Sequence, residues 1–172
     1  VASPKTLDLF RGKDHLAMIR HYCLNENMMF DKNDQSKLGY FVADVERAGP
    51  TCMLAEALAV AHGDPHYIGY LVGCSFARGF PRYARAFNRN FLALPALPSR
   101  VVEGACDNPA VVVRAIPTEK DGTWYAVVNA GVTSAENVTV RIPGGGPVTD
   151  AVSGERLADD GKVSASFHAC QL

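Results

Sequence analysis

Two carboxylates, Asp44 and Glu46, stand at the end of a short apolar segment, residues 40–45, that the sequence predicts to be a β-strand. Residues two apart on a strand point to the same side, so both carboxyl groups would face one pocket. Hydrolysis of a glycosidic bond uses such a pair, one as the acid and the other as the base or nucleophile. Asp44 and Glu46 are therefore the candidate catalytic residues. The alternatives are a solvated pair that bonds the neighbouring Arg47, or a pair that only binds sugar hydroxyl groups.

Three side chains are candidates for binding a substrate, namely Arg47, Arg78 and Tyr125. Arg47 and Arg78 each follow a predicted strand. Tyr125 lies on the opposite side of its strand from Trp124, which we expect in the core. Its ring could therefore stack on a sugar, as in a carbohydrate-binding module.

Arginines also recur at helical spacing along residues 78–89. They could bind an anionic sugar or a phosphate, and the alternative is a solvated helix face. The row consists of Arg78, Arg82, Arg85 and Arg89.

Metal and cofactor motifs are missing from the sequence. The five cysteines are widely spaced and include no CxxC pair, which argues against a zinc site or a dense set of disulfides. His62 and His66 are four apart, but Gly63 and Pro65 interrupt the helix that would bring them together as zinc ligands. No phosphate-binding glycine loop or dinucleotide fingerprint occurs. The sequence therefore predicts neither a metal site nor a cofactor.

The charge and hydropathy of the chain exclude two classes of partner. The formal net charge is −1, so no strong positive field would attract nucleic acid. No apolar run approaches the roughly 20 residues that a membrane span needs. We expect a globular protein that binds neither nucleic acid nor a membrane.

The elements that must position the candidate residues change character along the chain. Up to about residue 97 the apolar residues recur mainly at helical spacing, with two short apolar runs between them. The predicted helices cover residues 14–24, 50–62 and 81–92, and the predicted strands cover residues 40–45 and 67–72. The alternative for residues 67–72 is a buried helix. The run LPALP, residues 94–98, then ends the helical pattern, because its two prolines cannot continue a helix. We predict a domain boundary there, between residues 1–97 and 98–172.

Beyond this connector the chain has the pattern of antiparallel strands. Residues 110–116 are a β-branched run, and residues 124–130 are a second segment with the period of a strand. Apolar and polar residues alternate over residues 137–142 and 163–169, as expected of strands with one wet face. Turn sequences such as Asp121-Gly122 and Gly144-Gly145-Gly146 separate these segments. The second half is therefore predicted to be an antiparallel β-sandwich.

Residues 124–157, WYAVVNAGVTSAENVTVRIPGGGPVTDAVSGERL, resemble the C-terminal β-domain of barrel glycoside hydrolases, including α-amylase-like and α-galactosidase-like enzymes. The likeness rests on a strand ending in VVN, a strand of VTVRIP type and the hairpin VTDAVSGERL, followed by a closing strand over residues 163–170. The resemblance implies that residues 1–97 are the end of a (β/α)₈ barrel. Strand 40–45 with helix 50–62, and strand 67–72 with helix 81–92, would be its last two units.

The resemblance implies an α+β chain in which β/α units precede a β-sandwich that supports the barrel. Barrel enzymes carry their active sites at the C-terminal ends of the strands, which is where the candidate residues fall. The implied partner is a carbohydrate, and an extracellular or periplasmic location is favoured. Two β/α units cannot close a barrel, so we expect this chain alone to be inactive. The alternatives are a non-catalytic carbohydrate-binding module and a purely structural domain.

Overall fold

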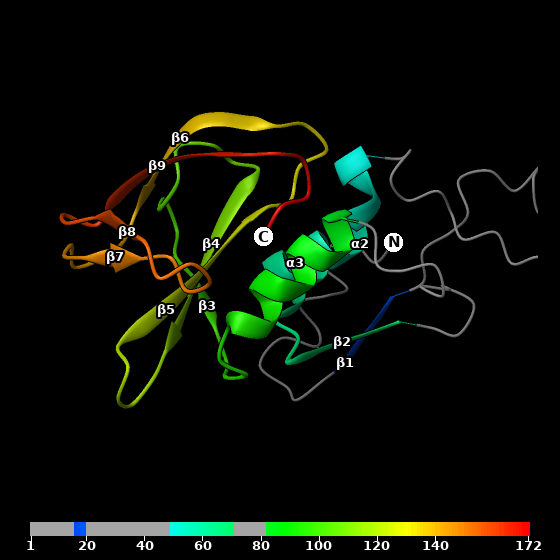
Figure 1. Ribbon diagram of the computed structural model, residues 1–172, viewed down its shortest axis with the longest axis horizontal. Helices are drawn as coiled ribbons and strands as arrows, with labels where there is room; N and C mark the ends of the chain where they lie inside the picture. The colour runs from blue at the N-terminus through cyan, green and yellow to red at the C-terminus, as the bar shows by residue number, and fades with distance from the viewer. Residues whose placement is uncertain (1–15, 20–48, 71–81) are drawn as a thin grey trace, which may run out of the picture.

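A part with helices and parallel strands precedes a part built of antiparallel strands in the computed structural model, which describes residues 16–19, 49–70 and 82–172 (Figure 1). The fold class is α+β, as predicted. The first part contains β1 (Leu16–Ile19), the 3₁₀ turn η2 (Gly49–Met53), α2 (Leu54–Leu58), the π-helical turn η3 (Ala59–Gly63), β2 (Tyr67–Tyr70) and α3 (Arg82–Ala93). The second part contains β3 (Arg100–Val101), β4 (Val111–Pro117), β5 (Thr123–Asn129), β6 (Ala135–Arg141), β7 (Val148–Thr149), β8 (Arg156–Ala158) and β9 (Lys162–Phe167).

The strands β1 and β2 run parallel to each other. Leu16 lies opposite Tyr67, and Ile19 lies opposite Tyr70. Parallel strands need a crossover connection, and the helical segment 49–63 belongs to it. The predicted helix over residues 14–24 is wrong at β1, because a short apolar run fits either period and pairing with β2 decides its conformation. The other residues of that predicted helix, and the predicted strand 40–45, lie outside the described residues.

The predicted helix 50–62 is confirmed, with η2, α2 and η3 following one another over residues 49–63. Met53, Ala57 and Ala61 are buried at four-residue spacing along one face. The helical segment ends at Asp64, whose φ of 50° is left-handed, a conformation that aspartate tolerates better than most residues. This geometry sets the Asp64 carboxylate just beyond the helix end.

The other two elements predicted before the connector are also confirmed. The predicted strand 67–72 is confirmed over residues 67–70 as β2, and the predicted helix 81–92 over residues 82–92 as α3. Residues 71, 72 and 81 lie outside the described residues. On α3, Ala84 and Phe87 are buried, whereas Arg85 and Arg89 are exposed. The helix is therefore amphipathic, with its aromatic side against the rest of the molecule.

Antiparallel pairing organises the second part of the chain. The strand order is β3-β4-β5 in one sheet, β6 pairs with β9, and β7 pairs with β8. The longest ladder joins β4 to β5, from Val111 opposite Asn129 to Pro117 opposite Thr123. The β6–β9 ladder is irregular between Ala135 and Val138.

The β3-β4-β5 sheet is covered on both faces. One face packs on the helices, and the other packs on β6 and the loop before β4 (Figure 1). Burial on both faces explains why the β4 sequence VVVRAIP shows no simple alternation. The helix-side cluster consists of Met53, Ala57, Val60, Ala61, Ala84, Phe87, Ala126, Val128, Ala169, Cys170 and Leu172. The strand-side clusters consist of Ala105, Val113 and Val140, and of Val111, Ala135 and Val138.

The helix-side cluster combines side chains from before and after the LPALP connector. Helices and sheet therefore bury a common apolar surface, which is the main stabilising term in packing one against the other. The domain boundary between residues 97 and 98 stays a prediction.

Candidate functional site

Asp44, Glu46, Arg47 and Arg78 lie outside the described residues, and their roles stay predictions. The candidate binding residue Tyr125 lies on β5 and is half-buried. Its side chain packs against the cluster formed by Ala105, Val113 and Val140. This contact covers part of the ring that stacking on a sugar would use. Trp124, predicted in the core, is half-buried.

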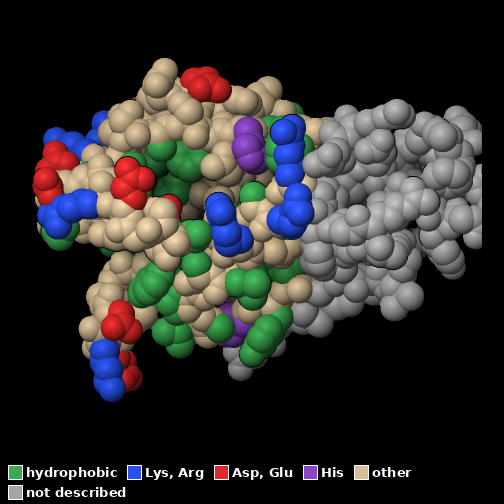
Figure 2. Space-filling view, in the orientation of Figure 1, with side chains coloured by type: hydrophobic (Ala, Val, Ile, Leu, Met, Phe, Trp, Pro, Cys, Tyr) green, Lys and Arg blue, Asp and Glu red, His purple; other side chains and the backbone are tan. Residues whose placement is uncertain are grey.

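A cavity of about 780 Å³ opens between β2, α3, the LPALP connector and the β4–β5 sheet. Its volume falls within the roughly 300–1,000 Å³ typical of small-molecule sites. Figure 2 shows hydrophobic side chains gathered at the surface around the lower end of α3 and the start of β2. The cavity is lined by Val60, Asp64, Pro65, His66, Tyr67, Ile68, Arg85, Asn88, Arg89, Phe91, Leu92, Leu94, Pro95, Ala96, Leu97, Ser99, Arg114, Ile116 and Ala126.

The helix α3 presents one stripe of side chains to this cavity. Arg85, Asn88, Arg89 and Leu92 are spaced by three and four residues, so they lie on one helical face. Both arginines are exposed, and neither forms a hydrogen bond or a close ion pair with a residue that the structure describes. Like charges four apart on a helix repel each other by a few tenths of a kcal/mol. The stripe therefore holds two positive charges that an anion between them would stabilise.

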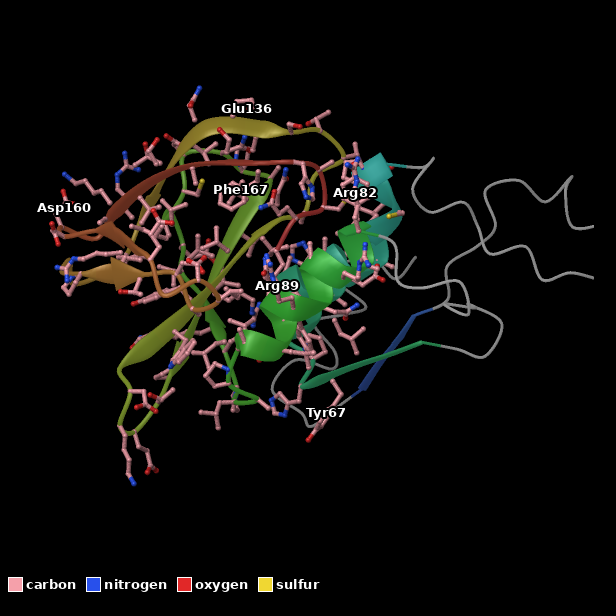
Figure 3. The ribbon with its side chains drawn as sticks, viewed as in Figure 1. Tyr67, Arg82, Arg89, Glu136, Asp160 and Phe167 are labelled. Atoms are coloured by element: carbon pink, nitrogen blue, oxygen red, sulfur yellow. The ribbon has the colours of Figure 1, made fainter. Side chains whose placement is uncertain are left out.

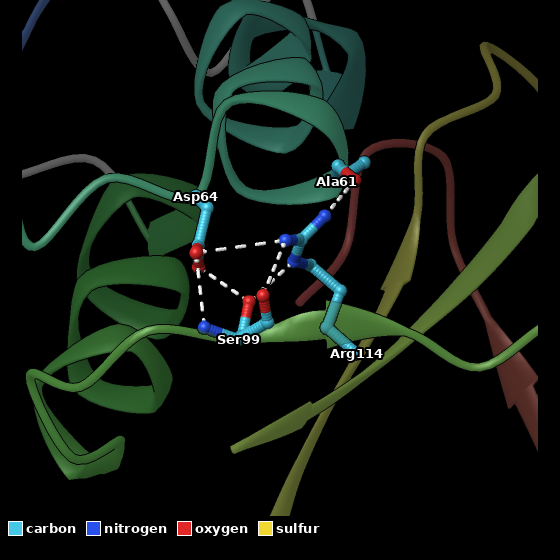
Figure 4. Close-up of polar contacts among 4 residues, drawn as sticks. All are labelled: Ala61, Asp64, Ser99 and Arg114. Carbon is cyan, nitrogen blue, oxygen red and sulfur yellow. Dashed lines mark hydrogen bonds and ion pairs between the residues drawn. The ribbon is translucent and has the colours of Figure 1, made fainter. Parts of the chain in front are cut away.

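At the base of the cavity, Arg114 of β4 is nearly inaccessible, with 1 % of its side chain exposed (Figure 4). Its Nη1 donates to the carbonyl oxygen of Ala61 at 2.9 Å, and its Nε donates to Ser99 Oγ at 2.6 Å. Its Nη2 donates to the Ser99 carbonyl oxygen at 3.3 Å and lies 3.6 Å from Asp64 Oδ2. The guanidinium thus bonds both the helix end and Ser99, the residue that follows the connector.

Asp64 completes this network from the other side. Its Oδ2 accepts a hydrogen bond from the Ser99 backbone N–H at 2.9 Å, and its Oδ1 accepts one from the Ser99 hydroxyl. A buried charge is tolerated only with partners of this kind, because removing it from water costs several kcal/mol. The Asp64–Ser99–Arg114 network is therefore a fixed, polar floor beneath a mostly apolar cavity.

The VVN signature of the sequence ends in Asn129, which is fully buried. Its Nδ2 donates to the carbonyl oxygens of Thr133 at 2.9 Å and His168 at 3.0 Å, and its Oδ1 accepts from the Gly131 N–H at 3.0 Å. A Cβ on Gly131 would lie 3.0 Å from Ala110 Cβ and 3.1 Å from that same Oδ1. Asn129 and Gly131 therefore hold the β5–β6 loop to the C-terminal segment, which is a structural role.

The VTDAVSGE signature also has a structural explanation. Asp150 Oδ1 accepts hydrogen bonds from the backbone N–H groups of Ser153 at 2.6 Å and Val152 at 2.9 Å. The bond from Ser153, followed by smaller contributions that include the positive charge of Arg89, lowers the pKa of Asp150 below its usual 3.8. Gly154 follows with a φ of 74°, which only glycine adopts freely. The signature thus encodes the turn between β7 and β8.

Two of the described thiols, those of Cys52 and Cys170, are poor nucleophiles. Cys52, Cys106 and Cys170 form no disulfide. Burial raises the pKa of Cys52 to about 12 and that of Cys170 to about 11, and the negative charge of Glu56 adds to both shifts. Both thiols therefore stay protonated at neutral pH, and the protonated form does not attack a substrate.

Comparison with known proteins gives no identification, since no family model, no curated protein and no solved structure matches the chain. Within the ranges that the structure describes, no helix is both long and apolar enough to cross a membrane. In the same ranges, no three or more His, Cys, Asp or Glu side chains come together as metal ligands.

The sequence pattern did not single out Asp64, Ser99 or Arg114 as parts of a site. One signal for Arg114 was present, because an arginine inside a β-branched run must find a partner if the strand is buried on both faces. No local signal marks Asp64 or Ser99, which meet Arg114 only through the tertiary fold. Arg85 and Arg89 belong to the arginine row that the sequence indicated.

Proposed function

We propose that this chain is the C-terminal part of a barrel glycoside hydrolase. It would contain the last two β/α units of the barrel and an accessory β-sandwich, formed by the sheets β3-β4-β5 and β6-β9, that supports them. The observation that carries the proposal is the order of elements, in which two parallel strands joined by a helical crossover precede α3 and the antiparallel sheets. A parallel pair of strands is rarely stable alone and occurs in larger α/β structures.

The positions of the candidate residues in the chain order support this proposal. In this version of the proposal β1, the parallel partner of β2, takes the place of the predicted strand 40–45 in the first unit. Asp44, Glu46 and Arg47 then fall in the connection between β1 and η2, and Arg78 falls between β2 and α3. In a barrel, such strand-to-helix connections form the catalytic face. Asp44 and Glu46 would then be the acid and the base or nucleophile, with Arg47 and Arg78 binding the substrate.

The packing of the β-domain on the helices supports the accessory role. The shared helix-side cluster buries apolar surface from both parts, and Arg114 bonds the end of the helical segment from within β4. A domain held in this way would stabilise the outer helices of the barrel. No catalytic group would be needed from its own strands.

Hydrolysis of aryl glycosides by the complete protein that carries this chain tests the proposal. We expect the complete protein to hydrolyse at least one member of a panel of aryl α- and β-glycosides, and the 172-residue chain to hydrolyse none. Asp44→Asn or Glu46→Gln should lower kcat by about 10²–10⁴-fold, the usual contribution of a general acid or base. Turnover by the chain alone, or no turnover by the complete protein, contradicts the proposal.

A second candidate function is a non-catalytic carbohydrate-binding module, and the cavity beside α3 is the observation that favours it. Binding of a glycan without hydrolysis by the complete protein would support this function over the first. Loss of binding in Tyr125→Ala would assign the glycan to β5 instead of the cavity.

A further inference from the structure

We propose that the cavity beside α3 binds a uronate residue of an acidic glycan, at a site separate from the catalytic face of the barrel. The choice of a sugar rests on the proposed function. The choice of an anionic sugar rests on the charges and the shape of the cavity itself.

The cavity lies at the end of β2 opposite to the end where the barrel proposal puts the catalytic face. It is lined by Asp64, Pro65 and His66 before β2 and by Tyr67 and Ile68 at the start of that strand. These residues mark the N-terminal end of β2. The strand-to-helix connection that leads to α3 leaves from the opposite end, after Tyr70. A ligand in the cavity would therefore bind without occupying the catalytic face.

The charges around the cavity favour an anion. Arg85 and Arg89 supply two exposed guanidinium groups from one stripe of α3. One of the described lining residues, Asp64, carries a carboxylate. This carboxylate already bonds Ser99 and Arg114. The guanidinium group matches a carboxylate in planarity and can bind it through two parallel hydrogen bonds. A carboxylate between Arg85 and Arg89 would also relieve their mutual repulsion.

The apolar surface around the cavity favours a ligand with a ring-sized body. Tyr67 is 66 % exposed, Leu92 81 % and Leu97 43 %, although all three are large apolar side chains. Exposed apolar side chains that gather around one concavity commonly mark a binding site. Figure 3 shows Tyr67 below β2, with Arg89 on α3 above it. The C–H face of a sugar ring would cover these apolar groups while its carboxylate reaches the arginines.

A compact anion fits the cavity less well than a uronate. Inorganic phosphate would engage the two arginines but would leave the apolar wall of Phe91, Leu92 and Leu94 in contact with water. A neutral sugar would cover the wall but would place no negative charge beside the two guanidinium groups at the cavity, since Asp150, whose carboxylate Arg89 stabilises electrostatically, is not among the described lining residues. Only a ligand with both features uses the whole cavity.

Binding of digalacturonate to the 172-residue chain, measured by titration calorimetry, tests this inference. Its neutral counterpart galactobiose and inorganic phosphate are titrated in parallel. We expect digalacturonate to bind at least about tenfold more tightly than either, because each charge-assisted contact contributes about that factor. Arg85→Gln and Arg89→Gln should each weaken binding about tenfold for the same reason.

Arg82→Gln is the matched control, because Arg82 lies on the same helix but does not line the cavity. Figure 3 shows it at the other end of α3 from Tyr67. Its substitution should leave binding unchanged, whereas Tyr67→Ala should weaken binding. Thermal unfolding of each variant verifies that the fold is intact. The exposed positions of Arg85 and Arg89 lead us to expect unchanged melting temperatures.

Three results would overturn the inference: no binding of digalacturonate, equal binding of phosphate, or equal weakening by Arg82→Gln. Its failure is distinguishable from failure of the proposed function. Hydrolysis of glycosides by the complete protein without uronate binding overturns this inference alone. Uronate binding without hydrolysis leaves the site in place and overturns the glycosidase proposal.

Discussion

At the scale of single residues, the most consequential side chain is Arg114. It carries a charge into a strand that is buried on both faces, and it is tolerated there because Ala61, Ser99 and Asp64 supply acceptors. The stabilisation comes less from the ion pair itself than from avoiding an unpaired charge, since the cost of desolvating a buried pair can exceed its Coulomb attraction. Removing one partner should therefore lower the free energy of unfolding by more than the intact pair contributes to it.

Arg114→Met should lower the free energy of unfolding by about 3–5 kcal/mol, the usual cost of breaking a buried pair. Asp64 and the Ala61 carbonyl would lose the donor that they share. The measurement is urea denaturation followed by circular dichroism. Arg156→Met, which removes an exposed ion pair with Asp159, is the control and should change stability by less than about 1 kcal/mol. Equal effects of the two substitutions would refute the role given to Arg114.

Asp150 predicts a pH dependence of the β7–β8 turn. Its pKa is lower in the folded chain than the usual 3.8 because Ser153 N–H bonds the ionised form. The stabilisation is therefore complete above the usual pKa and is lost as the pH falls through the lower, folded value. A carboxyl titration by NMR should place the Asp150 midpoint below 3.8. Asp150→Asn should remove this component of the acid sensitivity, and a midpoint at or above the usual value would contradict the prediction.

At the scale of elements, α3 packs into the helix-side cluster with one face and lines the cavity with another. Phe87 is 3 % exposed and packs in the helix-side cluster, whereas Leu92, five residues later, is 81 % exposed at the cavity. The same helix thus anchors the first part to the sheet and presents the arginine stripe. The two tasks fall on different faces, so they can be separated by substitution.

Phe87→Ala should lower the free energy of unfolding by about 3–5 kcal/mol, because it leaves a cavity in a closely packed cluster. Leu92→Ala should change it by less than about 0.5 kcal/mol, since its side chain is mostly in water already. Guanidinium denaturation of both variants checks the difference. A large loss with Leu92→Ala would mean that the exposed side chain is covered in solution.

The elements also show which parts of the fold the sequence could predict. The helices 49–63 and α3 carry several turns of periodic apolar residues, and β5 and β6 lie between clear turn sequences, so local pattern was enough. Four residues at β1 were too few to distinguish a strand from a helix, and only the distant β2 decides. The Asp64–Ser99–Arg114 network could not be predicted from the sequence for the same reason, because its members are brought together only by packing.

At the scale of the whole molecule, the shared cluster links the two parts of the chain. Its members come from the helical segment, α3, β5 and the C-terminal residues. Elements that share one core lose it together, which is the condition for a cooperative transition. We therefore expect the residues before and after the connector LPALP to unfold together, although the connector separates the two predicted domains.

Thermal unfolding should accordingly show one transition for the described parts. Trp124 reports on β5, and the far-ultraviolet signal near 222 nm, a helix band, reports mainly on the helices. The midpoints from its fluorescence and from circular dichroism should coincide. Phe87→Ala should shift both midpoints equally, although it lies in a helix and the fluorophore in a sheet. Two separate midpoints would show that the parts unfold independently.

The bond between Arg114 and the Ala61 carbonyl joins positions 53 residues apart in the chain. Closing a loop of this length costs conformational entropy, which slows the formation of contacts between residues far apart in the chain. This bond is therefore expected to form late, after the transition state for folding has been passed. Contacts of this kind set how slowly the native state opens, with little influence on how fast it is reached. Arg114 would then chiefly slow the unfolding rate of the molecule, because it bonds the two parts of the chain to each other.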